Sequence, residues 1–270
     1  MKIRAGMKTR FLKTLAVIFT LGIAIVAGYA AILLNPGPLF EYKVTIAQID
    51  VLSDHPIGSE VTDVIAKVSI ILRESELYDP EFEMRVLLTR DHVYNRLSRN
   101  RTLAYAVGPN AALSGEIDGA RNILYRETSP VRMNLVSTLS HELIHCLQWN
   151  HHGVIAFNKA LPRWKREGYA EYVALGDAKH RESYSIAESL DRLLAPDSMQ
   201  PVKGWITTED GFDRPILYCR FRLMTEYLLD VEGLSYERFV DEATERDDVY
   251  NRMITWHKKN SLRSQGGDST

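Results

Sequence analysis

The sequence contains only two cysteines, Cys146 and Cys219, among 270 residues. Two thiols cannot build a disulfide framework, so the fold depends on its apolar core. In an extracytoplasmic domain the two cysteines could pair, and two separately buried thiols are the simpler expectation. An excess of basic residues is also lacking, because the formal net charge is −2. The composition therefore predicts no nucleic-acid partner.

Charge is absent from residues 14–34, and no acidic residue precedes Glu41. As a helix, this uncharged segment would be about 31 Å long, which matches the roughly 30 Å core of a bilayer. Residues 1–13 are basic, so we expect them to stay in the cytoplasm and the rest of the chain to lie outside. The sequence thus predicts a single-pass membrane protein with an extracytoplasmic domain. The alternative is a signal peptide cleaved near Ala30, which would give a secreted protein.

Composition divides the rest of the chain into a short linker at 35–40, a folded domain at 41–260 and a flexible polar tail at 261–270. Within the domain, strands are expected mainly in the first half and helices in the second. We predict helices at 61–76 and 91–99, strands at 82–89, 102–107 and 121–127, a loop at 108–119, and then helices at 129–150, 162–175, 183–194, 215–230 and 236–258. Asp91 and Ser129 are the expected N-caps of two of these helices. The order predicts an α+β fold with a small mixed sheet followed by a helical lobe.

His141 and His145 are four residues apart on one of the predicted helices. This spacing places both imidazoles on the same helix face, where they can bind a single Zn²⁺ ion. Glu142, beside the first histidine, is then placed to act as the catalytic base that takes a proton from a zinc-bound water. The alternative is a helix with two exposed histidines around an ordinary glutamate.

A catalytic zinc site needs a third protein ligand, usually from another element. Glu167 and Glu171 follow the histidines on the next predicted helix and are also four residues apart. One carboxylate can bind the metal while the other orients a ligand histidine through its second ring nitrogen. We predict that Glu167 is the ligand and Glu171 the orienting residue. Two solvent-facing glutamates are the alternative.

The pattern His-Glu-x-x-His at 141–145, followed by Trp-x-x-Glu-Gly-x-Ala-x-Tyr at 164–172, resembles the gluzincin metallopeptidases, especially their peptidase MA-like domains. It is also similar to the corresponding segment of thermolysin-like aminopeptidases. The resemblance covers residues 129–175 and implies a zincin-like fold, in which a helix that carries the two histidines follows the sheet. It implies His141, His145 and Glu167 as zinc ligands, Glu142 as base and Glu171 as a supporting carboxylate.

The resemblance also implies a side chain that stabilises the oxyanion formed during hydrolysis. Tyr218 fits this role best, and Tyr184, Arg220 and Arg222 are weaker candidates. Gluzincins hold the substrate as an added strand along a sheet edge. Either 102–107 or 121–127 could supply that edge.

Together these features predict a membrane-anchored, zinc-dependent metallopeptidase that hydrolyses peptide bonds in a peptide or protein substrate. Two alternatives remain at this stage. One is a zinc amidase that acts on cell-wall peptides. The other is an envelope protein with a binding or structural role, which binds zinc without catalysis or has the motif by chance.

Overall fold

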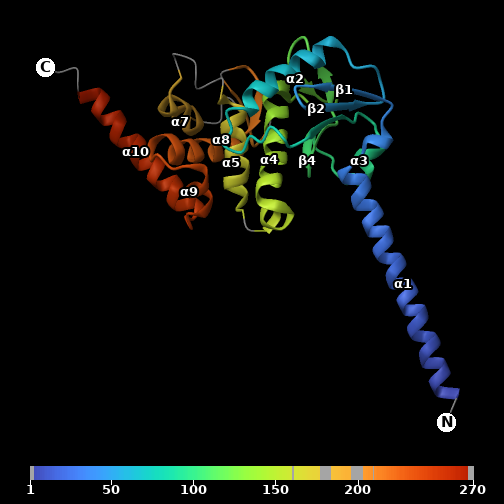
Figure 1. The fold of residues 1–270 in the computed structure, drawn as a ribbon. Helices are drawn as coiled ribbons and strands as arrows, with labels where there is room; N and C mark the ends of the chain where they lie inside the picture. Colours follow the sequence, from blue (N-terminus) through green and yellow to red (C-terminus); the bar gives the residue numbers. More distant parts are fainter. Residues whose placement is uncertain (1–2, 160, 177–183, 196–202, 209, 267–270) are drawn as a thin grey trace.

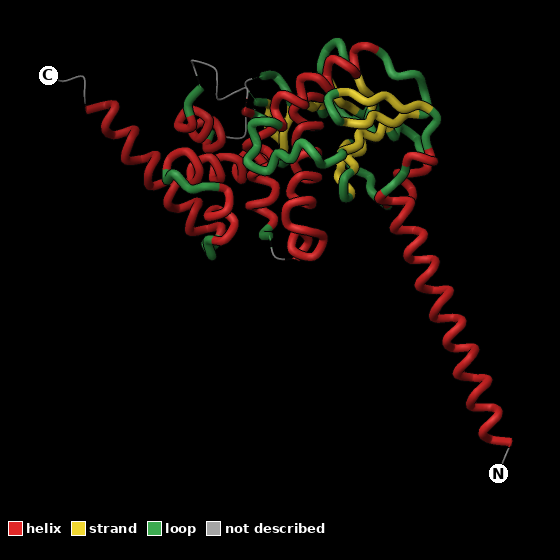
Figure 2. The backbone as a smooth tube through the Cα atoms, viewed as in Figure 1, coloured by secondary structure: helices red, strands yellow, loops and turns green. Residues whose placement is uncertain are grey.

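The computed structural model describes residues 3–159, 161–176, 184–195, 203–208 and 210–266 (Figure 1). The strands gather in one half of the domain, and the other half is almost entirely helical (Figure 2). The fold is therefore α+β with a small mixed sheet, as the sequence predicts.

One long helix, α1 (Ile3–Leu34), projects away from the domain (Figure 1). Its part Lys13–Leu34 is long and apolar enough to cross a membrane, and a signal sequence would have the same properties. This part begins one residue before the predicted anchor. A short 3-10 helix, η1 (Gly37–Leu39), lies in the predicted linker and leads into the domain.

The main sheet has five strands in the order β1-β2-β3-β5-β4. Strands β2, β3 and β5 run parallel to one another, and both edge strands pair antiparallel with their neighbours. The bounds are Tyr42–Ile46 for β1, Ile49–Ser53 for β2, Met84–Leu88 for β3, Ala104–Val107 for β4 and Asn110–Leu113 for β5.

The prediction of a loop at 108–119 is wrong, because this segment contains β5 and also β6 (Glu116–Asp118). Gly108 and Pro109 form only the tight turn between β4 and β5, with Gly108 at a φ of +58°. The glycine and proline residues correctly indicate turns. The strands between these turns are only three or four residues long, too short to show a clear strand pattern in the sequence.

Strands β6, β7 (Ile123–Tyr125) and β8 (Arg132–Asn134) form a separate antiparallel sheet. Pairing of β8 with β7 keeps 132–134 extended, so the helix predicted from Ser129 begins only at Leu135. The N-cap is Asn134, whose Oδ1 accepts from the Ser137 backbone N–H at 3.0 Å. The predicted Ser129 cap is therefore wrong.

Two helices pack near the sheet. Helix α2 (Ser59–Leu72) buries its apolar stripe, and α3 (Val93–Ser98) follows β3. The cap of α3 is His92, whose Nδ1 accepts from the Tyr94 backbone N–H at 3.0 Å. The predicted cap Asp91 is wrong, because its φ of +56° turns its backbone away from cap geometry.

The helix that carries His141 and His145 is α4 (Leu135–Lys159), which packs against β4 and β5 and bends at Gly153. Helix α5 (Arg163–Ala174) starts after Pro162, as predicted, and packs against both α4 and the later helix α8. The hydrophobic core lies between α2, the sheet, α4, α5 and α8. The remaining elements are α7 (Ile186–Leu194), the hairpin of β9 (Trp205–Thr207) and β10 (Asp213–Pro215), α8 (Ile216–Glu226), the π-helix η3 (Tyr227–Val231), α9 (Tyr236–Asp241) and α10 (Arg246–Gly266).

The helix predicted at 236–258 is in fact two helices, α9 and α10. Buried Lys165 explains the break, because its ammonium group donates to the carbonyls of Phe239 and Glu242 at 2.6 Å each. These bonds satisfy carbonyls at the end of α9 and hold the chain out of helical geometry. Helix α10 continues to Gly266, into the predicted tail. Residues 267–270 of that tail, and Ser183 at the predicted start of α7, lie outside the described residues.

Candidate metal centre

His141 and His145 lie one turn apart on α4, and both are buried. Their Nε2 atoms converge on one oxygen, Oε2 of Glu167, at 3.3 Å and 3.2 Å. Two ligand atoms bound to one tetrahedral zinc ion, each about 2.0–2.1 Å from it, are about 3.3 Å apart. Both histidine–glutamate distances therefore match the spacing of two ligands on one ion, and the donor atoms of all three residues lie within 4.8 Å of one another. A buried group that could hold a metal ion is thus present where the sequence predicts it.

The position of Glu167 depends on Gly168, the next residue of α5. A Cβ atom at Gly168 would lie 2.7 Å from the Phe221 carbonyl oxygen and would collide with Thr225 Oγ1 on α8. Only glycine allows the two helices to approach this closely. The Glu-Gly pair of the sequence pattern therefore combines a candidate ligand with the contact that places its helix.

Both histidines are also held through the ring nitrogen that faces away from Glu167. His141 Nδ1 lies 3.0 Å from Glu171 Oε1, as the sequence predicts for the orienting carboxylate. His145 Nδ1 lies 2.8 Å from Gln148 Oε1, and the Gln148 amide donates to the Arg166 carbonyl at 3.1 Å. Such contacts fix the tautomer and ring orientation of metal-binding histidines.

Glu171 is fixed in turn by Arg214 from β10. Arg214 Nη1 lies 3.3 Å from Glu171 Oε2, and its Nη2 donates to Ser137 Oγ at 2.7 Å. Sequence reasoning missed Gln148, Ser137 and Arg214. Helix spacing could have indicated the first two, because Gln148 lies three residues after His145 and Ser137 lies four residues before His141 on α4. No sequence pattern indicated Arg214, since it comes to the site from a hairpin that is distant in sequence.

The carboxylates shape the electrostatics of the group. Burial alone would lower the pKa of His141, but contacts with Glu167 and Glu171 outweigh it and raise the pKa to about 10. Burial would raise the pKa of Glu167, yet the two histidines hold it far below its usual range. Burial also opposes ionisation of Glu171, but His141 and Arg214 lower its pKa to about 2. Both carboxyl groups are therefore anionic and attract a cation.

Glu142 is half-buried and follows the first histidine on α4. Burial raises its pKa, while the neighbouring histidines act in the opposite direction. A raised pKa is suited to a general base, since a more basic carboxylate accepts a proton more readily.

The structure describes all four predicted oxyanion stabilisers. Among them, only Tyr218 has a ring contact with a histidine of the candidate metal site. Its ring stacks on that of His141, with centroids 5.6 Å apart and planes 10° from parallel. Burial and the charge of Glu167 raise its pKa to about 12, so its hydroxyl keeps its proton and can donate it. Arg220 instead lies over Tyr250.

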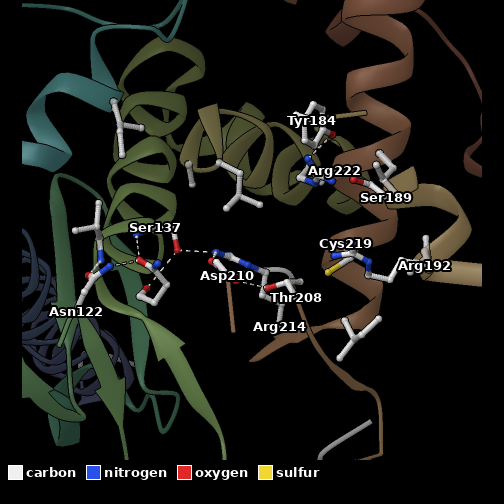
Figure 3. Close-up of a pocket in the computed structure, with 18 of the residues that line it drawn as sticks. Asn122, Ser137, Tyr184, Ser189, Arg192, Thr208, Asp210, Arg214, Cys219 and Arg222 are labelled. Atoms are coloured by element: carbon white, nitrogen blue, oxygen red, sulfur yellow. Dashed lines mark hydrogen bonds and ion pairs between the residues drawn. The ribbon is translucent and has the colours of Figure 1, made fainter. Parts of the chain in front are cut away.

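A cavity of about 420 Å³ lies next to the residues that support Glu171 (Figure 3). Ser137 and Arg214, which support the metal group through Glu171, form part of its wall. Tyr184 and Arg222, the two other sequence candidates, line another part, where Arg222 donates to the Tyr184 hydroxyl at 2.9 Å. Tyr184 and Arg222 therefore lie at the cavity wall, and neither is among the residues whose donor atoms converge at the candidate metal site.

The structure bears on two other expectations, the state of the cysteines and the free edge of a sheet. Cys146 is buried in the core and Cys219 lines the cavity, and both are free thiols. Strand β4 forms an edge of the main sheet, whereas β7, from the predicted strand 121–127, is central in its sheet. Only the strand predicted at 102–107 can therefore offer a free edge.

No family model matches the chain, and no curated protein matches it either.

Proposed function

We propose that this protein is a zinc-dependent metallopeptidase, anchored in a membrane by α1 with its domain on the extracytoplasmic side. The observation that carries the proposal is the convergence of His141 Nε2 and His145 Nε2 on Glu167 Oε2 at 3.2–3.3 Å. Each histidine is also held at its other ring nitrogen, by Glu171 or Gln148. Two buried imidazoles and one carboxylate, with a supporting contact for each ring, form the donor set of a catalytic zinc site.

Zinc bound to these ligands would acidify a water molecule and polarise the carbonyl of the substrate. Glu142 then accepts the proton of the attacking water and passes it to the leaving amine. Tyr218, protonated beside His141, donates a hydrogen bond to the oxygen that becomes negative. Glu171 holds His141 in place throughout, because it contacts the ring nitrogen that faces away from Glu167, and Arg214 fixes Glu171 in turn.

The surroundings of the group suit an extended peptide. Strand β4 is an edge of the main sheet and packs against α4, so a substrate can pair with it as an additional strand. The cavity lined by Ser137 and Arg214 can take one side chain of that substrate. Its apolar residues, among them Val136, Ile206 and Leu223, favour an apolar side chain.

The proposal is tested with the full chain in nanodiscs, loaded with zinc and incubated with a library of quenched fluorescent peptides. Glu142→Gln keeps the size of the side chain and removes the base. We expect it to lower kcat by about 10²–10⁴-fold while zinc stays bound. The matched control is Glu188→Gln, at an exposed position of α7, and it should retain full activity.

Zinc-loaded wild type that leaves the whole library intact would refute peptidase activity. Cleavage that Glu142→Gln leaves unchanged would refute the role of Glu142 and point to a contaminating protease.

A further inference from the structure

The end of α1 is held by the domain rather than joined through a loose linker. Tyr94 donates to the Leu33 carbonyl at 2.8 Å, and the Asn110 amide donates to the same carbonyl at 3.0 Å. Arg85 donates to the Leu34 carbonyl at 3.2 Å. The last carbonyls of a helix have no partners within it, so these side chains cap α1 and fix its direction. The domain therefore sits directly at the end of the apolar segment.

Helix α3 lies beside the last turns of α1, where the Tyr29 hydroxyl donates to the Leu97 carbonyl. This part of the chain carries Arg96, Arg99 and Arg101, all exposed. Among the residues that the structure describes, none of these arginines forms an ion pair. A cluster of unpaired basic side chains next to a membrane segment attracts the phosphates of anionic lipids.

The metal-bearing helix α4 also reaches the end of α1. A Cβ atom placed on Gly108 would lie 2.6 Å from Leu34 Cδ2 and 3.6 Å from Trp149 Cζ2. Trp149 and Leu34 are thus neighbours across this turn. Tryptophan is enriched at the boundary between lipid and water, and Trp149 lies at the level where the apolar segment ends.

Beyond Trp149, the chain bends at Gly153, which has a φ of +73°. The bend presents Val154 and Ile155, which are 57% and 74% exposed. This end of α4 lies on the side of the domain toward which α1 extends (Figures 1 and 2). Two adjacent exposed aliphatic side chains on that side can enter the headgroup layer of the bilayer.

The same end of α4 lies close to His145, one of the proposed zinc ligands. Trp149 follows His145 by four residues, about 6 Å along a helix axis. After the bend, the ring of Phe157 returns to within 6.1 Å of the ring of His145. A surface that rests on the bilayer here therefore keeps the metal group close to the lipid.

We propose that the face formed by α3 and by the bend of α4 at Gly153 is a second membrane contact, which binds the phospholipid surface of the bilayer that α1 crosses. Its arginines pair with lipid phosphates, and Val154 and Ile155 enter the headgroup layer. A second part of this inference rests on the proposed peptidase function. The substrates are then polypeptide segments that lie close to the membrane, such as the stretch just outside a transmembrane helix.

The contact is tested with the full chain in vesicles of phosphatidylcholine and phosphatidylglycerol. A bimane fluorophore is attached to Ile155→Cys in a Cys219→Ser background, since Cys146 is buried. Lipids with a nitroxide in the headgroup should quench it strongly. The matched control is Ile70→Cys on α2, also an exposed isoleucine at 60%, where the fluorophore should stay bright. Equal quenching at both positions, or none at position 155, overturns the proposal.

The arginines provide a second test that needs no catalysis. Arg96→Glu together with Arg99→Glu should reduce quenching at position 155 in vesicles that contain phosphatidylglycerol. Unchanged quenching would show that these arginines do not contribute to the membrane contact. Arg73→Glu with Arg121→Glu, at exposed positions after α2 and after β6, serves as the charge-matched control and should leave the quenching as it was.

The substrate class is tested with two peptides tethered to the same vesicles by a transmembrane helix. In one, the cleavable sequence follows the helix directly. In the other, a glycine-serine spacer of about 40 residues places it about 35 Å away on average. We expect the near site to be cut at least about tenfold faster, because it is held within reach of the metal group. Equal rates overturn the substrate class. If neither peptide is cut while position 155 is quenched, the peptidase function fails and the membrane contact stands.

Discussion

His141 Nδ1 lies 3.0 Å from Glu171 Oε1, on the side of the imidazole ring opposite to the nitrogen that faces Glu167. The two glutamates therefore hold the ring from both sides, although they come from the same helix. Glu171 is itself fixed by Arg214 at 3.3 Å. This chain of contacts links the proposed zinc ligand to the wall of the neighbouring cavity.

We predict that Glu171→Gln lowers the affinity of the protein for zinc by about 10–100-fold. The neutral amide still fills the space, but it attracts the Nδ1 proton less strongly and leaves Arg214 without its charged partner. Competition with a fluorescent zinc chelator measures the change. Glu188→Gln, on the surface of α7, should keep the affinity of the wild type. Equal affinities of the Glu171 variant and the wild type would show that Glu171 does not support His141.

Removal of the Tyr218 hydroxyl should affect turnover more than binding. We expect Tyr218→Phe to lower kcat by about 10²–10³-fold with little change in KM, because the hydrogen bond to the oxyanion forms only as the substrate reacts. The phenyl ring can still stack on His141, so zinc content should not change. Steady-state kinetics with a cleaved library peptide tests this. Tyr250→Phe is the control, and a kcat equal to that of the wild type in both variants argues against the role of Tyr218.

The contact between α5 and α8 should tolerate no side chain at Gly168. We predict that Gly168→Ala lowers the free energy of unfolding by about 1–3 kcal/mol, since its Cβ would lie 2.7 Å from the Phe221 carbonyl oxygen. Glu167 would shift with its helix, so zinc affinity should fall as well. Thermal and urea unfolding of the full chain in detergent measure the loss. Gly37→Ala, where a Cβ meets no atom within 4 Å, should be close to neutral. A Gly168 variant as stable as the wild type contradicts the close helix contact.

Local spacing explains which parts of the site could be predicted. His141 and His145, and likewise Glu167 and Glu171, share helix faces because four residues make about one turn. The sequence therefore showed which side chains come together, and the structure places them together. Arg214 could not be foreseen, because its contact with Glu171 depends on the packing of a distant hairpin against α4 and α5.

The fold was predictable to a similar extent. Helices with a clear apolar stripe, such as α2 and α5, were found near their observed positions. The β1–β2 hairpin was missed, because its turn uses Ala47 and Gln48 at φ values of +47° and +71° instead of glycine or asparagine. The start of α4 was misplaced because pairing between β7 and β8 overrides the helical start signal at Ser129.

The central claim is a zinc site formed by His141, His145 and Glu167, and metal analysis tests it most directly. The full chain is purified in detergent, incubated with zinc, dialysed and measured beside His145→Ala and the control His55→Ala, an exposed histidine. We predict about one zinc ion per chain in the wild type and in the control, and none in His145→Ala. A folded wild type that stays free of zinc after this treatment, or a His145→Ala variant that binds zinc as the wild type does, would contradict the account.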